Sequence, residues 1–304
     1  MALWNLEGPI WRKAAMNFRS RAIDSVIATP LGRAAFKVVQ PMIHQARRLA
    51  NPDVPIRHAI YKTDCLGKKI AVQHRRDNAS DLMAIDQCFT QSQYDMPVGA
   101  HGVLIENIYQ EIVASGRQPL IVDCGANIGC SVLWFHARYP KAHIVALEPA
   151  PDNFELLSAN CTGLDVDLRQ VGVAAADGRS RLTDTGGGGM AYRTEANGHG
   201  PEIEMLSLRS LLASKPAERY ARFILKIDIE GAEKNLFNEN SAMLNEFPLI
   251  ILEPHDWLLP GQLSSREFFR FHVNAGREFC MKQENVASIA LHSSLLGMTT
   301  GLKN

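Results

Sequence analysis

Short apolar runs alternate with amphipathic segments through the middle of the chain. Residues 120–122 and 143–147 are strand-like apolar runs, and each precedes a segment with helical spacing, over 131–139 and from Asp152 onward. A third apolar run covers Val166–Val173. Strands that alternate with helices are typical of a parallel sheet with helices on both faces. The pattern therefore predicts an α/β fold with a doubly wound, mostly parallel sheet.

The pattern resumes after a glycine-rich interruption. Residues 183–201 hold six glycines in 19 positions, so we expect no packed element there, and either a mobile flap or a plain surface connection fits. Beyond it we expect a strand, a helix, a strand, a helix and a strand, over 203–206, 208–213, Arg222–Ile229, Lys234–Met243 and Leu249–Leu252. The chain from Arg266 shows helix-like spacing and then a strand-like run.

A hairpin and two helices are expected before the sheet, over 58–74, 78–94 and 105–116. The hairpin turns at Leu66-Gly67. Asn78 or Ser80 could cap the first helix, because short polar side chains accept hydrogen bonds from exposed helix N–H groups. Gly116 would end the second helix.

The amino-acid composition argues against several classes of protein. The 304 residues include 32 Lys plus Arg and 32 Asp plus Glu, so the formal net charge is zero, whereas a dedicated nucleic-acid binder usually shows a basic footprint. No stretch approaches the ~20 apolar residues of a transmembrane span, and the N-terminus lacks the apolar core of a secretory signal. The six cysteines lack the close pairs of a zinc site and are too few for a disulfide-stapled fold. We therefore expect a cytoplasmic protein with free thiols and no nucleic-acid partner.

The first fifty residues carry a charge of their own. They contain eight Lys or Arg and two acids, which gives a net charge of +6, among apolar residues at loosely helical spacing. Such a segment can lie on an anionic membrane surface or an acidic partner, or pack its apolar face on its own domain or on a second copy in a homo-oligomer. A Pro-rich linker follows at 51–57. The sequence predicts a basic helical arm with its linker over 1–57 and a catalytic domain over 58–304.

The most informative segment is the turn after the run 120–122. It reads D-x-G-x-N-x-G, with Asp123, Gly125, Asn127 and Gly129. A glycine-rich turn between a strand and a helix lets the backbone approach a nucleotide, but a dinucleotide site has G-x-G-x-x-G instead. Glu148, after the next strand, suits hydrogen bonds to two ribose hydroxyls. An acid at the first position suits a ligand with an ammonium and a sulfonium better than a pyrophosphate.

These segments resemble the FkbM family of S-adenosylmethionine-dependent methyltransferases. The similarity covers about residues 75–260 and is strongest in five stretches: 121–135 (IVDCGANIGCSVLWF), 146–160 (ALEPAPDNFELLSAN), 172–178 (GVAAADG), 224–237 (ILKIDIEGAEKNLF) and 251–257 (ILEPHDW). The resemblance implies a class I, Rossmann-like fold, S-adenosylmethionine as cofactor, and methyl transfer to a hydroxyl of a sugar, glycolipid, polysaccharide or related metabolite. Residues 205–212 lack the acidic pair that is usual in the family.

The resemblance also implies roles for individual residues. The methionine half of the cofactor would be surrounded by residues of the glycine turn, namely Asp123, Gly125, Asn127 and Gly129. Glu148 would hold the ribose. Asn153 would either orient the loop after Glu148 or cap the helix that follows. Val173, with Ala174, would lie by the adenine.

Charged side chains gather at the expected carboxyl ends of the fourth and fifth strands. With a period of two, Lys226, Asp228 and Glu230 share one face, and Glu253 and His255 follow the fifth strand. Ligands in open α/β sheets bind beyond these strand ends, so we expect the catalytic residues here. His255, with an ordinary pKa of about 6.5, could take the proton of the acceptor hydroxyl. The structural alternative is a Lys226–Asp228 ion pair that only satisfies itself.

Two details stay open at the level of sequence. Asp256 could steer the imidazole of His255, although neighbours in an extended chain point in opposite directions. Asp228, Glu230, Glu253 and His255 could also collect Mg²⁺ or Mn²⁺, which prefer such ligands. Their spacing has no metal-specific signature, so the sequence does not predict a metal site.

The leading hypothesis is an S-adenosylmethionine-dependent O-methyltransferase that acts on a small-molecule or saccharide acceptor. A methyltransferase-fold binding protein without turnover is one alternative. A Rossmann oxidoreductase is another, but the missing G-x-G-x-x-G counts against it.

Overall fold

The computed structural model describes most of the predicted catalytic domain. The described residues are 58–76, 78–184, 192–195, 200–230, 233–239, 241–256 and 259–291. The predicted basic arm and linker, 1–57, lie outside them. Within the described ranges no helix has the length and apolar character needed to cross a bilayer.

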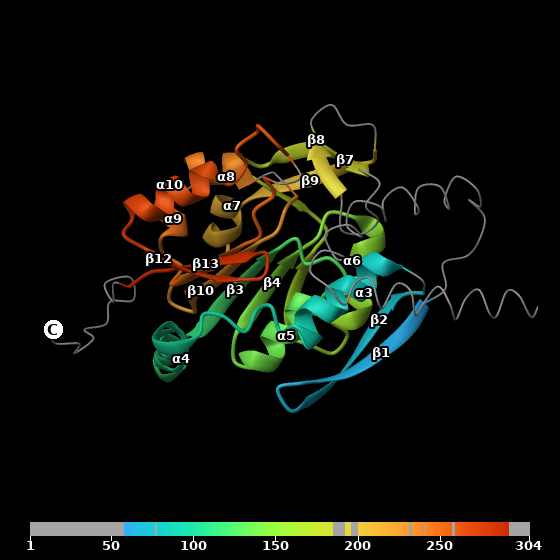
Figure 1. Ribbon diagram of the computed structural model, residues 1–304, viewed down its shortest axis with the longest axis horizontal. Helices are drawn as coiled ribbons and strands as arrows, with labels where there is room; N and C mark the ends of the chain where they lie inside the picture. Colours follow the sequence, from blue (N-terminus) through green and yellow to red (C-terminus); the bar gives the residue numbers. More distant parts are fainter. Residues whose placement is uncertain are drawn as a thin grey trace, which may run out of the picture. The chain divides into compact units, whose positions relative to one another are not determined.

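A seven-stranded sheet forms the centre of the domain (Figure 1). In spatial order its strands are β12 (Glu278–Lys282), β13 (Asn285–Ile289), β11 (Leu249–Leu252), β10 (Tyr220–Ile227), β3 (Gln118–Cys124), β4 (His143–Leu147) and β5 (Val166–Arg169). The five strands from β11 to β5 run parallel, and β13 is antiparallel to both its neighbours. The chain order changes direction between β3 and β10, which is the switch point where such sheets bind ligands. The predicted doubly wound, mostly parallel sheet is confirmed.

Alternate residues of the central strands face two helical layers. Ile121 and Ile144 pack with the helices of one face, α4 (Gly99–Ala114), α5 (Cys130–Arg138) and α6 (Pro151–Asn160). Val122 and Val145 pack with the helices of the other face, α7 (Leu208–Ala213), α8 (Glu233–Glu239), α9 (Ser241–Leu244) and α10 (Arg266–Asn274). Figure 1 shows the two layers on opposite sides of the sheet. Both faces are covered, which explains why these strands read as continuous apolar runs.

The elements before the sheet follow the prediction. Strands β1 (His58–Cys65) and β2 (Lys68–Arg75) pair antiparallel around the turn at Leu66-Gly67. Helix α3 (Ala79–Ile85) begins after Asn78, whose side chain accepts hydrogen bonds from two backbone N–H groups, and it continues into a π-helical turn, η1 (Asp86–Thr90). All six cysteines are free thiols, as expected.

Two predictions about the middle of the chain are wrong. The run 166–173 is not one strand, because β5 ends at Arg169 and Gly172–Ala174 form a separate strand, β6. Strand β6 belongs to a second sheet, in which the further strands are β9 (Glu202–Ser207), β7 (Gly178–Asp184) and β8 (Tyr192–Glu195). Gly172 permits this pairing, since a Cβ there would lie 2.7 Å from the sulfur of Met205. The glycine-rich segment 183–201 contains β8, which the antiparallel ladder with β7 holds in place.

Other boundaries differ by a few residues, and one difference affects the site. The predicted helix 234–243 corresponds to α8 and α9, and residue 240 between them lies outside the described residues. Strand β10 ends at Ile227, so Asp228 and Glu230 lie in the segment beyond the strand. Their side chains therefore need not follow the alternation of a strand.

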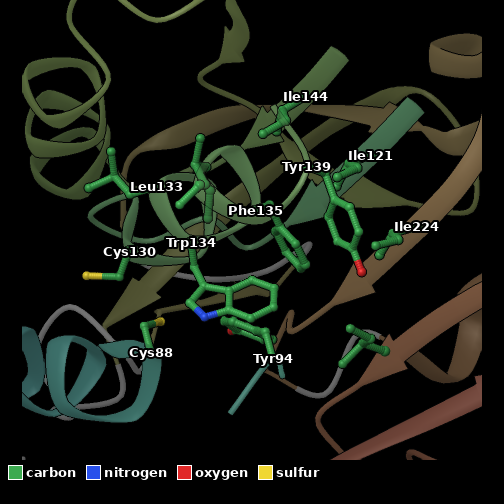
Figure 2. Close-up of a cluster of buried hydrophobic side chains, with 14 of the residues drawn as sticks. Cys88, Tyr94, Ile121, Cys130, Leu133, Trp134, Phe135, Tyr139, Ile144 and Ile224 are labelled. Carbon is green, nitrogen blue, oxygen red and sulfur yellow. The ribbon is translucent and has the colours of Figure 1, made fainter. Parts of the chain in front are cut away.

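Aromatic rings fill the core beside α5. Figure 2 shows Trp134 beside Tyr94, which comes from the loop after η1, and Phe135 and Tyr139 in the same cluster. The ring centroid of Tyr94 lies 6.0 Å from the centroid of Trp134 and 5.3 Å from the centroid of Phe135. These contacts attach the loop after η1 to the helix that follows the glycine turn.

Replacing Phe223 by alanine tests this core. The fully buried ring lies between Tyr109 and Tyr139, with centroids 5.6 and 5.0 Å away. Its removal leaves a cavity between rigid rings, so we expect the free energy of unfolding to fall by about 3–5 kcal/mol. Val103→Ala, on the exposed side of α4, is the control and should change it by less than about 0.5 kcal/mol. Urea unfolding measures both, and equal midpoints for the two variants would contradict the packing.

Candidate functional site

The glycine turn joins the carboxyl ends of three strands. Gly125, Asn127 and Gly129 all have positive φ, at 83°, 51° and 92°. The N–H of Gly125 donates to the carbonyl of Leu147 at the end of β4, 2.9 Å away. A Cβ on Gly125 would lie 1.8 Å from the backbone oxygen of Asp228, just beyond β10. Both the φ angle and this contact exclude other residues at position 125.

Glu148 follows β4 and reaches back to the turn. Its Oε2 accepts a hydrogen bond from the N–H of Asn127 at 2.9 Å, and its Oε1 accepts from the N–H of Ala150 at 3.0 Å and the amide of Asn153 at 3.3 Å. The side chain is buried. Burial raises the pKa of Glu148 to about 7, although these hydrogen bonds and the charge of Lys226 act against the rise. The structure thus places Glu148 against the glycine turn, and its contact with a ribose stays a prediction.

Asn153 orients Glu148 and does not cap α6. The N-cap of α6 is Ala150, which makes no side-chain cap hydrogen bond. Asn153 lies inside the first turn, so its side chain is past the position that can cap the first N–H groups. Its amide donates to Glu148, and its carbonyl oxygen accepts from the guanidinium of Arg75 at 2.8 Å. Of the two hypotheses for Asn153, the cap is wrong.

The sequence analysis did not identify Arg75 as a residue that supports the site. This buried guanidinium forms ion pairs with Asp81 at 2.6 Å and Asp152 at 2.7 Å, and it also donates to Asn153. It ties the β1–β2 hairpin and α3 to the start of α6. In the sequence it stands in an Arg-Arg-Asp run that is typical of an exposed turn, so no local signal marked it.

Asp123 and Lys226 form a buried ion pair across β3 and β10. The Nζ of Lys226 lies 3.0 Å from Asp123 and 3.5 Å from Asp228, and it donates to the carbonyl of Gly125 at 2.6 Å. Ser131 donates to the other oxygen of Asp123 at 2.5 Å. Burial by itself would lower the pKa of Lys226, but the two carboxylates raise it, so the ammonium stays charged. The ion pair named as the structural alternative is present, with Asp123 as the closer partner.

Four carboxylates surround the imidazole of His255 beyond the ends of β10 and β11. The Nδ1 atom lies 2.7 Å from Glu233, and Nε2 lies 3.6 Å from Asp228, 3.6 Å from Glu230 and 4.0 Å from Glu253. The imidazole is only 1% exposed, whereas the side chains of Asp228 and Glu230 are 28% and 20% exposed. The structure therefore brings the predicted residues of the two strand ends together in what we call the carboxylate–histidine cluster.

The imidazole does not keep its ordinary pKa. Burial lowers the pKa of His255, but the hydrogen bond with Glu233 and the charges of Glu230, Glu233 and Glu253 raise it to about 10. At neutral pH these carboxylates therefore favour the imidazolium. This differs from the expected titration near 6.5, and the role of His255 as the base stays a prediction.

Glu233 takes the steering role expected of Asp256. Asp256 points away from the imidazole and accepts hydrogen bonds from the N–H and hydroxyl of Ser265. Glu233 begins α8 and comes from a different part of the chain. The signal that could have found it is its place in the stretch 224–237, where the family resemblance is strong.

Val173 lies on β6, in the second sheet. It is buried in the same hydrophobic cluster as Leu147, the last residue of β4. The same sheet packs Met205 in a small cluster with Ala150, next to the loop that follows Glu148. The structure therefore places β6 near the Glu148 side of the site, and contact with an adenine stays a prediction.

Sequence comparisons relate the domain to known methyltransferases. Residues 123–269 match the family described as "Methyltransferase FkbM domain". The chain is 42% identical over 69 residues to "Methyltransferase sdnD" of Sordaria araneosa, which covers 21% of this chain and 27% of that protein. It is 26% identical over 158 residues to "Methyltransferase 1" of Beauveria bassiana (strain ARSEF 2860), which covers 44% and 63%. The matched segments thus span about a quarter of the first relative and somewhat under two thirds of the second.

Solved structures that match this chain weakly include two methyltransferases bound to SAH. The Podospora anserina methyltransferase PaMTH1, bound to SAH, matches with a TM-score of 0.36 at 11% identity, over 71% of this chain and 96% of that chain. An O-methyltransferase from Bacillus cereus in complex with SAH matches with a TM-score of 0.32 at 12% identity, over 69% and 91%. Residues 123–269 of this chain thus match the FkbM methyltransferase domain, and they lie on a sheet of the topology expected for it.

Proposed function

We propose that this chain transfers the methyl group of S-adenosylmethionine to a hydroxyl oxygen of a small-molecule or saccharide acceptor. The observation that supports the proposal most directly is that the glycine turn and the carboxylate–histidine cluster are in contact, although they suit different ligands. The glycine turn with Glu148 suits the cofactor, and the carboxylate–histidine cluster suits a polyhydroxylated acceptor. The close approach of Gly125 to the backbone of Asp228 joins the two halves.

On the cofactor side, Glu148 is oriented before any ligand binds. Backbone N–H groups hold both of its oxygens, and a carboxylate oxygen can accept a further hydrogen bond. Two ribose hydroxyls fit this arrangement. The residues of the glycine turn would lie along the methionine half of the cofactor, and Val173 would lie by the adenine.

On the acceptor side, the reaction needs alignment and a place for one proton. The bond between the methyl carbon and sulfur breaks as the carbon–oxygen bond forms, which leaves S-adenosylhomocysteine, a methyl ether and the hydroxyl proton. The protein aligns the oxygen with the methyl group. Asp228 and Glu230 are the more exposed carboxylates of the cluster, so they are suited to bind the hydroxyl and receive its proton. Lys226 and His255 hold these carboxylates in position.

A labelled-donor assay tests the reaction class. The full chain is incubated with S-adenosylmethionine that carries a radiolabelled methyl group and with sugars, polyols, carboxylic acids, amines and thiols. We expect label in base-stable products of the hydroxylated acceptors only, because the cluster is built to bind hydroxyls. Label confined to amines, thiols or base-labile esters would contradict O-methylation. Thermal stabilisation by NAD(H) and not by S-adenosylhomocysteine would favour the oxidoreductase alternative.

Glu148→Ala should weaken the binding of S-adenosylhomocysteine by about 2–4 kcal/mol, because a buried pair of charge-assisted hydrogen bonds to the ribose is lost. Isothermal calorimetry measures the affinity. Glu155→Ala, on the exposed side of the following helix α6, is the matched control and should bind as the unaltered chain does. Unchanged affinity for Glu148→Ala would remove Glu148 from the cofactor site.

Affinity for S-adenosylhomocysteine should fall as the pH drops from 8 to 6. Burial raises the pKa of Glu148 to about 7 against the nearby charge of Lys226, and only the ionised carboxylate accepts hydrogen bonds with both oxygens. Protonation therefore competes with binding, and the dissociation constant should rise about tenfold across this range. Glu148→Gln has no titrating group at this position and should show a flat profile. A flat profile for the unaltered chain would show that the charge of Glu148 does not support binding.

A further inference from the structure

We propose that Asp228, Glu253 and His255 form a binding site for one divalent cation of the Mg²⁺ or Mn²⁺ type. The site lies on the acceptor side of the carboxylate–histidine cluster. These side chains alone define the site, and the role of the cation rests on the proposed function.

The distances between the ligand atoms fit a shared cation. One ligand atom from each of the three residues lies within 4.8 Å of the others. The Nε2 atom of His255 is 3.6 Å from Asp228 and 4.0 Å from Glu253, which is longer than a hydrogen bond. Ligands about 2.1 Å from an octahedral cation lie about 3.0 Å apart when adjacent and about 4.2 Å apart when opposite. The two separations from Nε2 lie between these values, so small shifts of the side chains would bring the three ligand atoms onto one cation.

The orientation of His255 is a second observation, independent of the acidic ligands. Its Nδ1 atom pairs with Glu233 at 2.7 Å, and both side chains are 1% exposed. Histidines that bind a metal usually donate their other ring N–H to a carboxylate, which fixes the ring and leaves the second nitrogen free to coordinate. Here that second nitrogen, Nε2, points into the cluster and makes no hydrogen bond with any residue that the structure describes.

The local charge favours a cation at this point. Asp228, Glu230, Glu233 and Glu253 lie around one imidazole. Lys226 is the nearby ammonium, but it lies closer to the carboxylate of β3 than to Asp228. Buried carboxylates are stable only when positive charge or hydrogen bonds compensate them. A divalent cation would bring two positive charges to the place where three ligand atoms already meet.

The ligand set indicates which cation and which acceptor to expect. Two carboxylates and one imidazole, with no thiolate, suit Mn²⁺ or Mg²⁺ better than softer metals. Three protein ligands leave positions open on an octahedral ion. Two neighbouring oxygens of the acceptor can fill these positions, so we infer an acceptor with a vicinal diol or an equivalent pair of oxygens. Coordination also lowers the pKa of a bound hydroxyl, which eases the loss of its proton during methyl transfer.

Binding of Mn²⁺ to the full, tag-free chain tests the proposal. The chain is freed of metal with a chelator and titrated with Mn²⁺ alone, with bound and free ion distinguished by electron paramagnetic resonance. We expect one ion per chain. Glu253→Gln and His255→Ala should each weaken binding at least about tenfold, and Glu233→Gln, which disturbs only the orientation of the ring, should weaken it by about tenfold or more.

The matched control is Asp256→Asn. This carboxylate is adjacent to His255 in the chain but hydrogen-bonds Ser265, so Mn²⁺ affinity should stay unchanged. Each variant is also titrated with S-adenosylhomocysteine, and unchanged cofactor affinity shows that it is folded.

Two results would overturn the cation site. One is a chain that binds S-adenosylhomocysteine but not Mn²⁺. The other is equal Mn²⁺ affinity for the unaltered chain and a folded His255→Ala variant. A chain that binds Mn²⁺ as expected but not S-adenosylhomocysteine supports the cation site and overturns the proposed function, because the Mn²⁺ titration does not use the cofactor.

Discussion

One buried ammonium, that of Lys226, holds the glycine turn and the carboxylate–histidine cluster next to each other. Lys226 on β10 pairs with Asp123 on β3, contacts the carbonyl of Gly125 and lies 3.5 Å from Asp228. A buried charge is costly unless it is paired. The ends of β3 and β10 therefore cannot separate without leaving charges unpaired in the core. The close contact between Gly125 and the backbone of Asp228 depends on the same approach of the two strands.

The cofactor side is supported by elements on both sides of the central sheet. From the N-terminal hairpin, Arg75 holds Asn153, and Asn153 holds Glu148. From the second sheet, Met205 packs in one cluster with Ala150. Arg75 lies outside the matched segment 123–269, so part of what orients the site comes from a region that the family match does not include.

The carboxylate–histidine cluster shows how several weak constraints make one specific arrangement. Its members come from three places in the chain: the segment after β10, the start of α8 and the segment after β11. Glu233 fixes the ring of His255 from one side, and carboxylates lie 3.6 to 4.0 Å from the other side. Such an arrangement needs a positive charge at its centre, either on the imidazole or on a bound ion. Both solutions place a polar, charged surface where an acceptor hydroxyl would meet the methyl group.

The sequence by itself determined what local signals encode. Strands β4 and β11 have the predicted bounds, because apolar runs mark them directly. Only the tertiary structure decided which side chains meet. The choice of Glu233 over Asp256, the role of Arg75 and the division of Val166–Val173 between two sheets all depend on contacts between residues far apart in the chain. The same holds for the pKa of His255, since two of the carboxylates that raise it, Glu230 and Glu233, come from other segments. A local pattern carries no record of such contacts.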